Sequence, residues 1–156
     1  FMASNNALHT ELKRVKQELA GYKIELHQAR GYLQCILQNS EDMIFATEVG
    51  GMLISFSKGG EKVLGYTWEE LVGRNIKDLA EDPLLFQDFI SSSLQGGVTT
   101  QLDLAFRHKE GRSIYCNVTL INLTNREGQR VGTVGVCRDI TLWKKLQEDL
   151  VRIDRL

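Results

Sequence analysis

Three histidines are the side chains of this sequence best suited to metal binding or to acid–base chemistry near neutral pH. Metal sites place their ligands at short, characteristic spacings. The histidines are His9, His27 and His108, and they have no such spacing. The first two fall on a helical arm and the third falls in a polar turn. We therefore predict that each is a solvated residue and that the chain has no metal site.

The three cysteines are an odd number and lie far apart in the sequence, at Cys35, Cys116 and Cys137. This pattern argues against the disulfide framework of a secreted protein and against a zinc site. Cys116 and Cys137 lie in apolar runs, where a free cysteine usually acts as a small buried hydrophobe. We therefore expect a reducing, cytoplasmic environment and no redox role for these two thiols.

Catalytic machinery is not recognisable in the sequence. It contains no nucleophile paired with a base, no catalytic carboxylate dyad and no glycine-rich ATP lid. Lys and Arg (19) nearly balance Asp and Glu (20), and no apolar run approaches the roughly 20 residues that span a bilayer. We predict a non-enzymatic segment whose partners are proteins, with no nucleic acid and no direct membrane contact.

Apolar side chains are most regular in the first part of the chain, where their spacing alternates between four and three residues. This is the spacing of a coiled-coil seam. A long amphipathic helix that packs on its own domain is the alternative, although such faces are usually wider. The predicted seam consists of Leu8, Leu12, Val15, Leu19, Tyr22, Leu26, Ala29, Leu33 and Ile36.

Charged residues flank this seam in an order that favours one orientation. In a parallel pair of helices, each glutamate at heptad position g faces a basic residue at position e of the partner. An antiparallel pair would place like charges together. We therefore predict a parallel homodimer. The interhelical pairs are Glu11 with Lys16, Glu18 with Lys23 and Glu25 with Arg30.

The rest of the sequence has room for one globular domain. We assign residues 5–38 to the coiled-coil helix, 39–141 to the domain and 142–156 to an outgoing helix. Ser57 is expected to cap a short helix that ends at Gly65. Apolar runs between polar or glycine turns predict an α+β fold, with strands at 43–47, 52–56, 98–107, 113–123 and 131–138 and a helix at 83–94.

Four motifs carry a resemblance to a known family. They are Asn39-Ser40-x-Asp42-x-Ile44-Phe45, Gly65-Tyr66-Thr67-x-Glu69-Glu70-Leu71-x-Gly73, His108-Lys109-Glu110-Gly111 and Arg138-Asp139-Ile140-Thr141. Together they resemble the PAS sensory domain. The resemblance implies a five-stranded antiparallel sheet with short helices on one face, enclosing a pocket. The segment after Leu146 looks like the linker to the phosphoacceptor helices of bacterial sensor histidine kinases.

The resemblance leaves the ligand open. Members that form a photochemical flavin adduct carry Gly-Arg-Asn-Cys, whereas this chain has Gly73-Arg74-Asn75-Ile76. Without a thiol at Ile76 no cysteinyl adduct forms there. Haem-binding members supply an axial histidine from the helices over the sheet, and none falls there. We predict no particular cofactor. Noncovalent flavin and a small metabolite both stay open. Trp68 would suit a flavin, and an aromatic residue at this position equally fits the packing of a helix onto the sheet.

The helix at 83–94 is the segment expected to line a pocket. Its apolar face equally fits ordinary core packing, which would make the domain a relay without a ligand. The candidate pocket residues are Leu85, Phe86, Phe89 and Ile90.

Two residues near the end of the domain are candidates for signal transmission. The resemblance assigns Asp139 and Thr141 to the coupling of the sheet to the outgoing helix. Thr141 is also placed to be the N-cap of a helix that begins at Leu142, and Asp139 would meet a favourable helix dipole. Starting that helix is therefore an alternative role for both. The outgoing coil is weaker, because Asp149 would face Asp154 in a parallel pair.

These observations favour a regulatory sensor and dimerisation module of a two-component histidine kinase. Such a module relays a ligand, redox or conformational signal through a parallel dimer to a downstream output domain in a phosphorelay. A ligand-free structural module for dimerisation and relay is one alternative. A module of another signalling enzyme, such as a diguanylate cyclase, is the other.

Overall fold

The computed structural model describes residues 2–96 and 100–155, with only the backbone described at 93–96 and 100. The chain divides into two compact units, residues 1–36 and 37–156. The predicted coiled-coil segment lies in helix α1 (Met2–Asn39), which has 38 residues and continues through Gly21 and Gly31. No helix in the described part of the chain has the length and apolar character required to span a bilayer.

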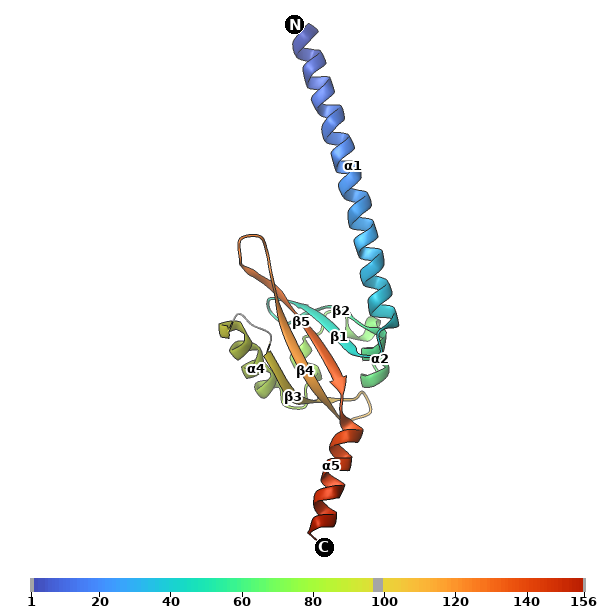
Figure 1. Ribbon diagram of the computed structural model, residues 1–156, viewed down its shortest axis with the longest axis vertical. Helices are drawn as coiled ribbons and strands as arrows, with labels where there is room; N and C mark the ends of the chain where they lie inside the picture. The colour runs from blue at the N-terminus through green and yellow to red at the C-terminus, as the bar shows by residue number, and fades with distance from the viewer. Residues whose placement is uncertain (1, 97–99, 156) are drawn as a thin grey trace. The chain divides into compact units, whose positions relative to one another are not determined.

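The second unit is built on a five-stranded antiparallel sheet in the order β2-β1-β5-β4-β3 (Figure 1). The predicted sheet is confirmed. Its strands are β1 (Met43–Glu48), β2 (Leu53–Phe56), β3 (Thr100–Arg107), β4 (Ser113–Thr124) and β5 (Arg130–Asp139). Residues 98 and 99 of the third predicted strand lie outside the described residues.

Short helices connect β2 to β3 and cover the inner face of the sheet. They are α2 (Lys58–Leu64), α3 (Trp68–Leu71), the 3₁₀ helix η1 (Ile76–Leu79) and α4 (Pro83–Gly96). Helix α5 (Thr141–Asp154) follows β5. The predicted capping of α2 is confirmed: the Ser57 hydroxyl accepts a hydrogen bond from the Gly60 amide at 3.1 Å, and Gly65 ends the helix at φ 79°.

The core lies between these helices and the inner face of the sheet. Side chains alternate along β4, so that every second residue from Ile114 to Leu120 is buried. At the centre, the ring of Phe86 lies 6.4 Å from that of Phe45 and 5.9 Å from that of Phe106. Phe45 leaves no room for a side chain at Gly135, where a Cβ would lie 2.1 Å from its ring. Aromatic side chains therefore fill the middle of the domain.

The prediction that His108 is a solvated turn residue is wrong. His108 is buried, and its Nδ1 accepts a hydrogen bond from the Glu110 amide at 3.0 Å. Its ring lies against Gly65, where a Cβ would lie 2.6 Å from the imidazole. The turn after β3 is also joined to the end of α2 by a hydrogen bond from the Lys109 amide to the Leu64 carbonyl at 2.9 Å. His108 thus packs the turn onto the end of α2.

Candidate functional site

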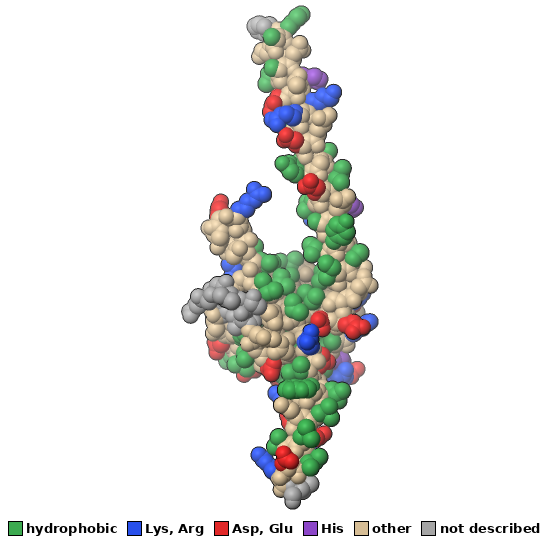
Figure 2. Space-filling model, viewed as in Figure 1, with side chains coloured by type: hydrophobic (Ala, Val, Ile, Leu, Met, Phe, Trp, Pro, Cys, Tyr) green, Lys and Arg blue, Asp and Glu red, His purple; other side chains and the backbone are tan. Residues whose placement is uncertain are grey.

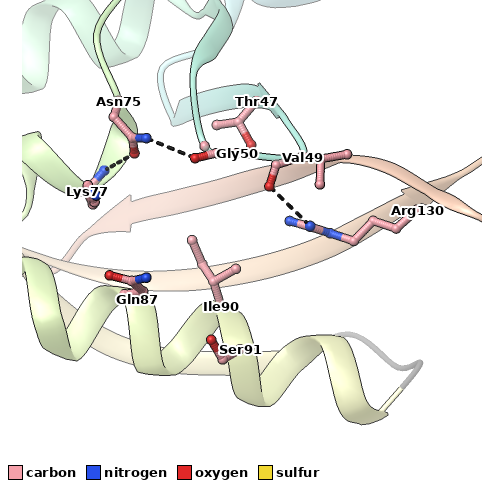
Figure 3. Close-up of a pocket in the computed structure, with 10 residues that line it drawn as sticks. Thr47, Val49, Gly50, Asn75, Lys77, Gln87, Ile90, Ser91 and Arg130 are labelled. Carbon is pink, nitrogen blue, oxygen red and sulfur yellow. Dashed lines mark hydrogen bonds between the residues drawn. The ribbon is translucent and has the colours of Figure 1, made fainter.

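A polar cavity of about 260 Å³ lies between the β1–β2 turn, η1, α4 and the start of β5 (Figure 3). Its lining combines backbone of the glycine turn with polar side chains and a few apolar ones. The lining residues are Thr47, Val49, Gly50, Gly51, Asn75, Lys77, Gln87, Ile90, Ser91 and Arg130. This volume is below the roughly 300–1,000 Å³ of pockets that hold drug-sized ligands. The cavity therefore suits a small molecule.

One wall of the cavity is held by Asn75. Its Nδ2 donates to the Gly50 carbonyl at 2.9 Å, and its Oδ1 accepts from the Lys77 amide at 3.1 Å. Gly51, at φ 94°, lets the turn approach Asn75, because a Cβ at Gly51 would lie 2.7 Å from the Asn75 Oδ1. The Gly51 carbonyl also accepts from the Ile76 amide at 2.9 Å. These bonds join the β1–β2 turn to η1 as one wall.

The opposite wall carries Arg130. Its Nη1 donates to the Val49 carbonyl at 3.3 Å and its Nη2 to the Thr133 hydroxyl at 2.7 Å. Its Nε is buried and has no acceptor in the described part of the chain. Buried donors are nearly always paired, so an unfilled guanidinium donor is a costly and unusual feature. Both cationic lining residues, Lys77 and Arg130, lack an ion pair with any described carboxylate.

The four predicted pocket residues divide between the core and the surface. Phe86 and Phe89 are buried in the core, whereas Ile90 is half-buried and lines the cavity. Leu85 is 49% exposed and lines a separate pocket with Leu104. The aromatic stripe of α4 thus serves core packing.

Sequence reasoning missed the polar members of the cavity. Gln87 and Ser91 are four residues apart on α4 and share one face of that helix with Ile90. The four-residue spacing of these two polar residues was a readable signal. Arg130 had no such signal, because only the pairing of β1 with β5 brings it to Val49.

Asp139 and Thr141, the predicted transmission residues, lie together at the junction between β5 and α5. The Asp139 Oδ1 accepts from the Thr141 amide at 2.9 Å and from the Thr141 hydroxyl at 2.6 Å. The N-cap position is Ile140, and Thr141 is the first helical residue. The expectation that Thr141 caps the helix is therefore wrong, and the carboxylate of Asp139 accepts the first helical amide instead.

Tyr115 of β4 joins the sheet to this junction and was not predicted. Its carbonyl accepts from the Ile140 amide at 2.8 Å, and its amide donates to the Thr141 hydroxyl at 3.0 Å. The Lys144 Nζ lies 4.5 Å from the centroid of its ring. A strand 26 residues earlier in sequence thus contacts the first turn of α5 through three groups.

The two buried cysteines near the junction are poorly suited to nucleophilic chemistry. Burial raises the pKa of Cys116 to about 12, and the charge of Asp139 adds to this. Burial likewise raises the pKa of Cys137 well above its usual range. A thiol reacts through its thiolate, so both are unreactive near neutral pH. Cys35, on α1, is exposed.

The predicted seam residues lie on α1, and all of them are exposed in the single chain. Leu12, Leu19 and Leu26 are each more than half exposed. Arg14, which is not among the predicted interhelical pairs, forms an ion pair with Glu11 and another with Glu18, the latter at 2.8 Å. Figure 2 shows apolar side chains in green along this helix.

Comparison with known proteins identifies the domain. A family model described as PAS domain matches residues 41–142. The chain belongs to the PAS domain family. Signal transduction histidine-protein kinase AtoS of Escherichia coli (strain K12) is 23% identical over 146 residues, which are 94% of this chain and 24% of that kinase. The chain thus spans about a quarter of the length of that relative. This PAS sensory domain is homologous to part of a sensor kinase.

Solved structures share the PAS fold. The PAS domain of a Colwellia psychrerythraea protein superposes with a TM-score of 0.66 at 23% identity, covering 76% of this chain and 98% of that one. An RNA-binding Light-Oxygen-Voltage receptor superposes with a TM-score of 0.68 at 20% identity, covering 81% of this chain and 37% of that one. At these identities the likeness concerns the fold alone.

Proposed function

We propose that this PAS domain is the regulatory sensor and dimerisation module of a two-component histidine kinase. The bonds of Tyr115 to Ile140 and Thr141 carry this proposal, because they join the sheet to the helix that leaves the domain. A change in the sheet would reach α5 through these contacts. The similarity to AtoS over most of the chain supports a kinase as the parent protein. The chain itself performs no catalysis and acts in the cytoplasm.

The module acts as a parallel homodimer. The exposed seam of α1 supplies the dimer contact, with Leu8, Leu19 and Ile36 among its members. Helix α5 also carries exposed apolar residues, including Trp143 and Leu146. This helix connects the domain to the output domain. Apolar residues at this heptad spacing become buried when two such helices pair.

A ligand-free relay is the second candidate function. The cluster of Phe45, Phe86 and Phe106 favours it, because these rings occupy the middle of the domain. The same cluster disfavours noncovalent flavin, which would have to displace them. At the position of the adduct-forming cysteine, Ile76 is fully buried in the core. A small metabolite in the polar cavity requires no such rearrangement.

Charge reversal on α1 tests the dimer. Lys16→Glu combined with Lys23→Glu places glutamates opposite glutamates in the parallel pair. We expect the dimer dissociation constant, measured by sedimentation equilibrium, to rise at least about 10-fold, and more at low salt than at high salt.

Lys13→Glu combined with Lys62→Glu is the matched control, since it changes net charge equally at residues outside both the seam and the predicted interhelical pairs. The proposal fails if the control weakens the dimer as much as the test variant does. It also fails if the unaltered chain sediments as a monomer at micromolar concentration.

A further inference from the structure

We propose that the polar cavity binds a small organic anion through its carboxylate groups, with dianions preferred over monoanions. This inference rests on the proposed sensory function and names the class of signal. In Figure 3, Lys77 and Arg130 stand on opposite sides of the cavity, with Gln87 and Ser91 of α4 below them.

Charge is the first argument for an anion. The described residues that line the cavity include two cations, Lys77 and Arg130, and no carboxylate. Neither cation has an ion-pair partner within the described chain, whereas Lys58, Lys109 and Arg112 all do. A recess with uncompensated positive charge concentrates anions.

Unfilled hydrogen-bonding capacity is the second argument. Arg130 is held in place by one bond from Nη1 to Val49 and one from Nη2 to Thr133, which leaves the second N–H of each terminal nitrogen without a described acceptor. The side chains of Gln87 and Ser91 form no hydrogen bond with another described residue. Guanidinium groups hold carboxylates with paired, charge-assisted hydrogen bonds. The cavity thus offers donors that its own chain leaves unused.

The shape of the lining separates an organic anion from an inorganic one. Figure 3 shows the Ile90 side chain rising from α4 into the cavity, and Val49 lies near Arg130. These apolar groups suit a short carbon skeleton between two charged ends. The cavity volume of about 260 Å³ leaves room for only a small molecule.

Titration of the whole chain with succinate tests the proposal. Succinamide is the neutral analogue, acetate the monoanion, and inorganic phosphate and chloride are controls at equal ionic strength. Backbone NMR signals of Gly50, Gly51, Lys77 and Ser91 should shift with succinate, less with acetate and not with succinamide. Arg130→Gln should weaken succinate binding about 10- to 100-fold, as expected for a hydrogen-bonded charge.

Arg138→Gln is the matched control, because Arg138 is exposed on the same strand and outside the cavity. If Arg130→Gln does not fold, Lys77→Gln replaces it and should weaken binding about 2- to 5-fold. Equal shifts with succinamide or chloride, binding of phosphate alone, or an equal loss in Arg138→Gln would overturn the proposal. None of these outcomes changes the result expected from charge reversal on α1. Failure of anion binding can therefore be told apart from failure of the proposed dimer.

Discussion

Phe86 sits where the helical layer meets the sheet, fully buried between the rings of Phe45 and Phe106. Such contacts add to the stabilisation from burial alone. The neighbouring Leu84 on the same helix is 74% exposed. Two apolar residues on one helical turn therefore differ in how much their burial stabilises the domain.

Phe86→Ala should lower the free energy of unfolding by about 3–5 kcal/mol, because it leaves a cavity at the centre of the core. Urea unfolding at a fixed protein concentration measures this change. Leu84→Ala is the control and should change stability by less than about 0.5 kcal/mol. A small effect of Phe86→Ala would mean that the aromatic cluster does not hold the helices on the sheet.

Thiol labelling distinguishes the three cysteines. At pH 8, iodoacetamide should modify Cys35 alone in the folded chain, since the raised pKa values of Cys116 and Cys137 keep them protonated and burial keeps them inaccessible. In denaturant all three should react, as mass spectrometry of peptides would show. Rapid labelling of Cys116 in the folded state would contradict its placement in the core.

Residue types alone predicted chemistry poorly at two positions. His108 was expected in solvent because its motif is a polar turn, but the turn packs on Gly65 at the end of α2. Arg130 was not singled out in the sequence, yet strand pairing brings it to Val49. Both contacts join residues more than 40 positions apart. No local pattern encodes such contacts.

At the scale of elements, local sequence signals predicted most of the fold. Apolar runs between polar turns located β4 and β5, and capping residues located α2. The short helix η1 was missed because its four residues are too few for a periodic signal. The junction of β5 with α5 was located, but the role of Thr141 was not. Its hydroxyl bonds to β4, a contact that depends on sheet topology.

Thr141→Val tests the junction, since it removes the hydroxyl that accepts from the Tyr115 amide while keeping the shape of the side chain. Hydrogen exchange at Tyr115 should accelerate about 3- to 10-fold, corresponding to the loss of one hydrogen bond. Thr141→Ser retains the hydroxyl and should exchange like the unaltered chain. Unchanged exchange in Thr141→Val would show that this bond does not couple β4 to α5.

At the scale of the whole molecule, the domain contains a small cavity and a five-stranded sheet, and both α1 and α5 carry exposed apolar residues. The seam of α1 was readable from sequence because heptad spacing is independent of tertiary contacts. The ion pairs within one α1 helix were not predicted. Arg14 contacts Glu11 and Glu18, the same glutamates that are expected to pair with lysines of the partner helix. These exposed pairs are weak and are screened by salt, so giving them up for pairs across the proposed dimer would cost little.

The orientation of α1 in the proposed dimer can be measured as the distance between two identical labels, one on each chain. A spin label on Asn6→Cys in a Cys35→Ser background lies outside the seam near the start of α1. In a parallel dimer the two labels lie side by side, within about 30 Å, because helix axes in contact are about 10 Å apart. Pulsed electron–electron double resonance should show this short distance. In an antiparallel dimer centred on Tyr22, the labels would be about 48 Å apart along the axis, at about 1.5 Å per residue, and that distance would rule out parallel pairing of α1.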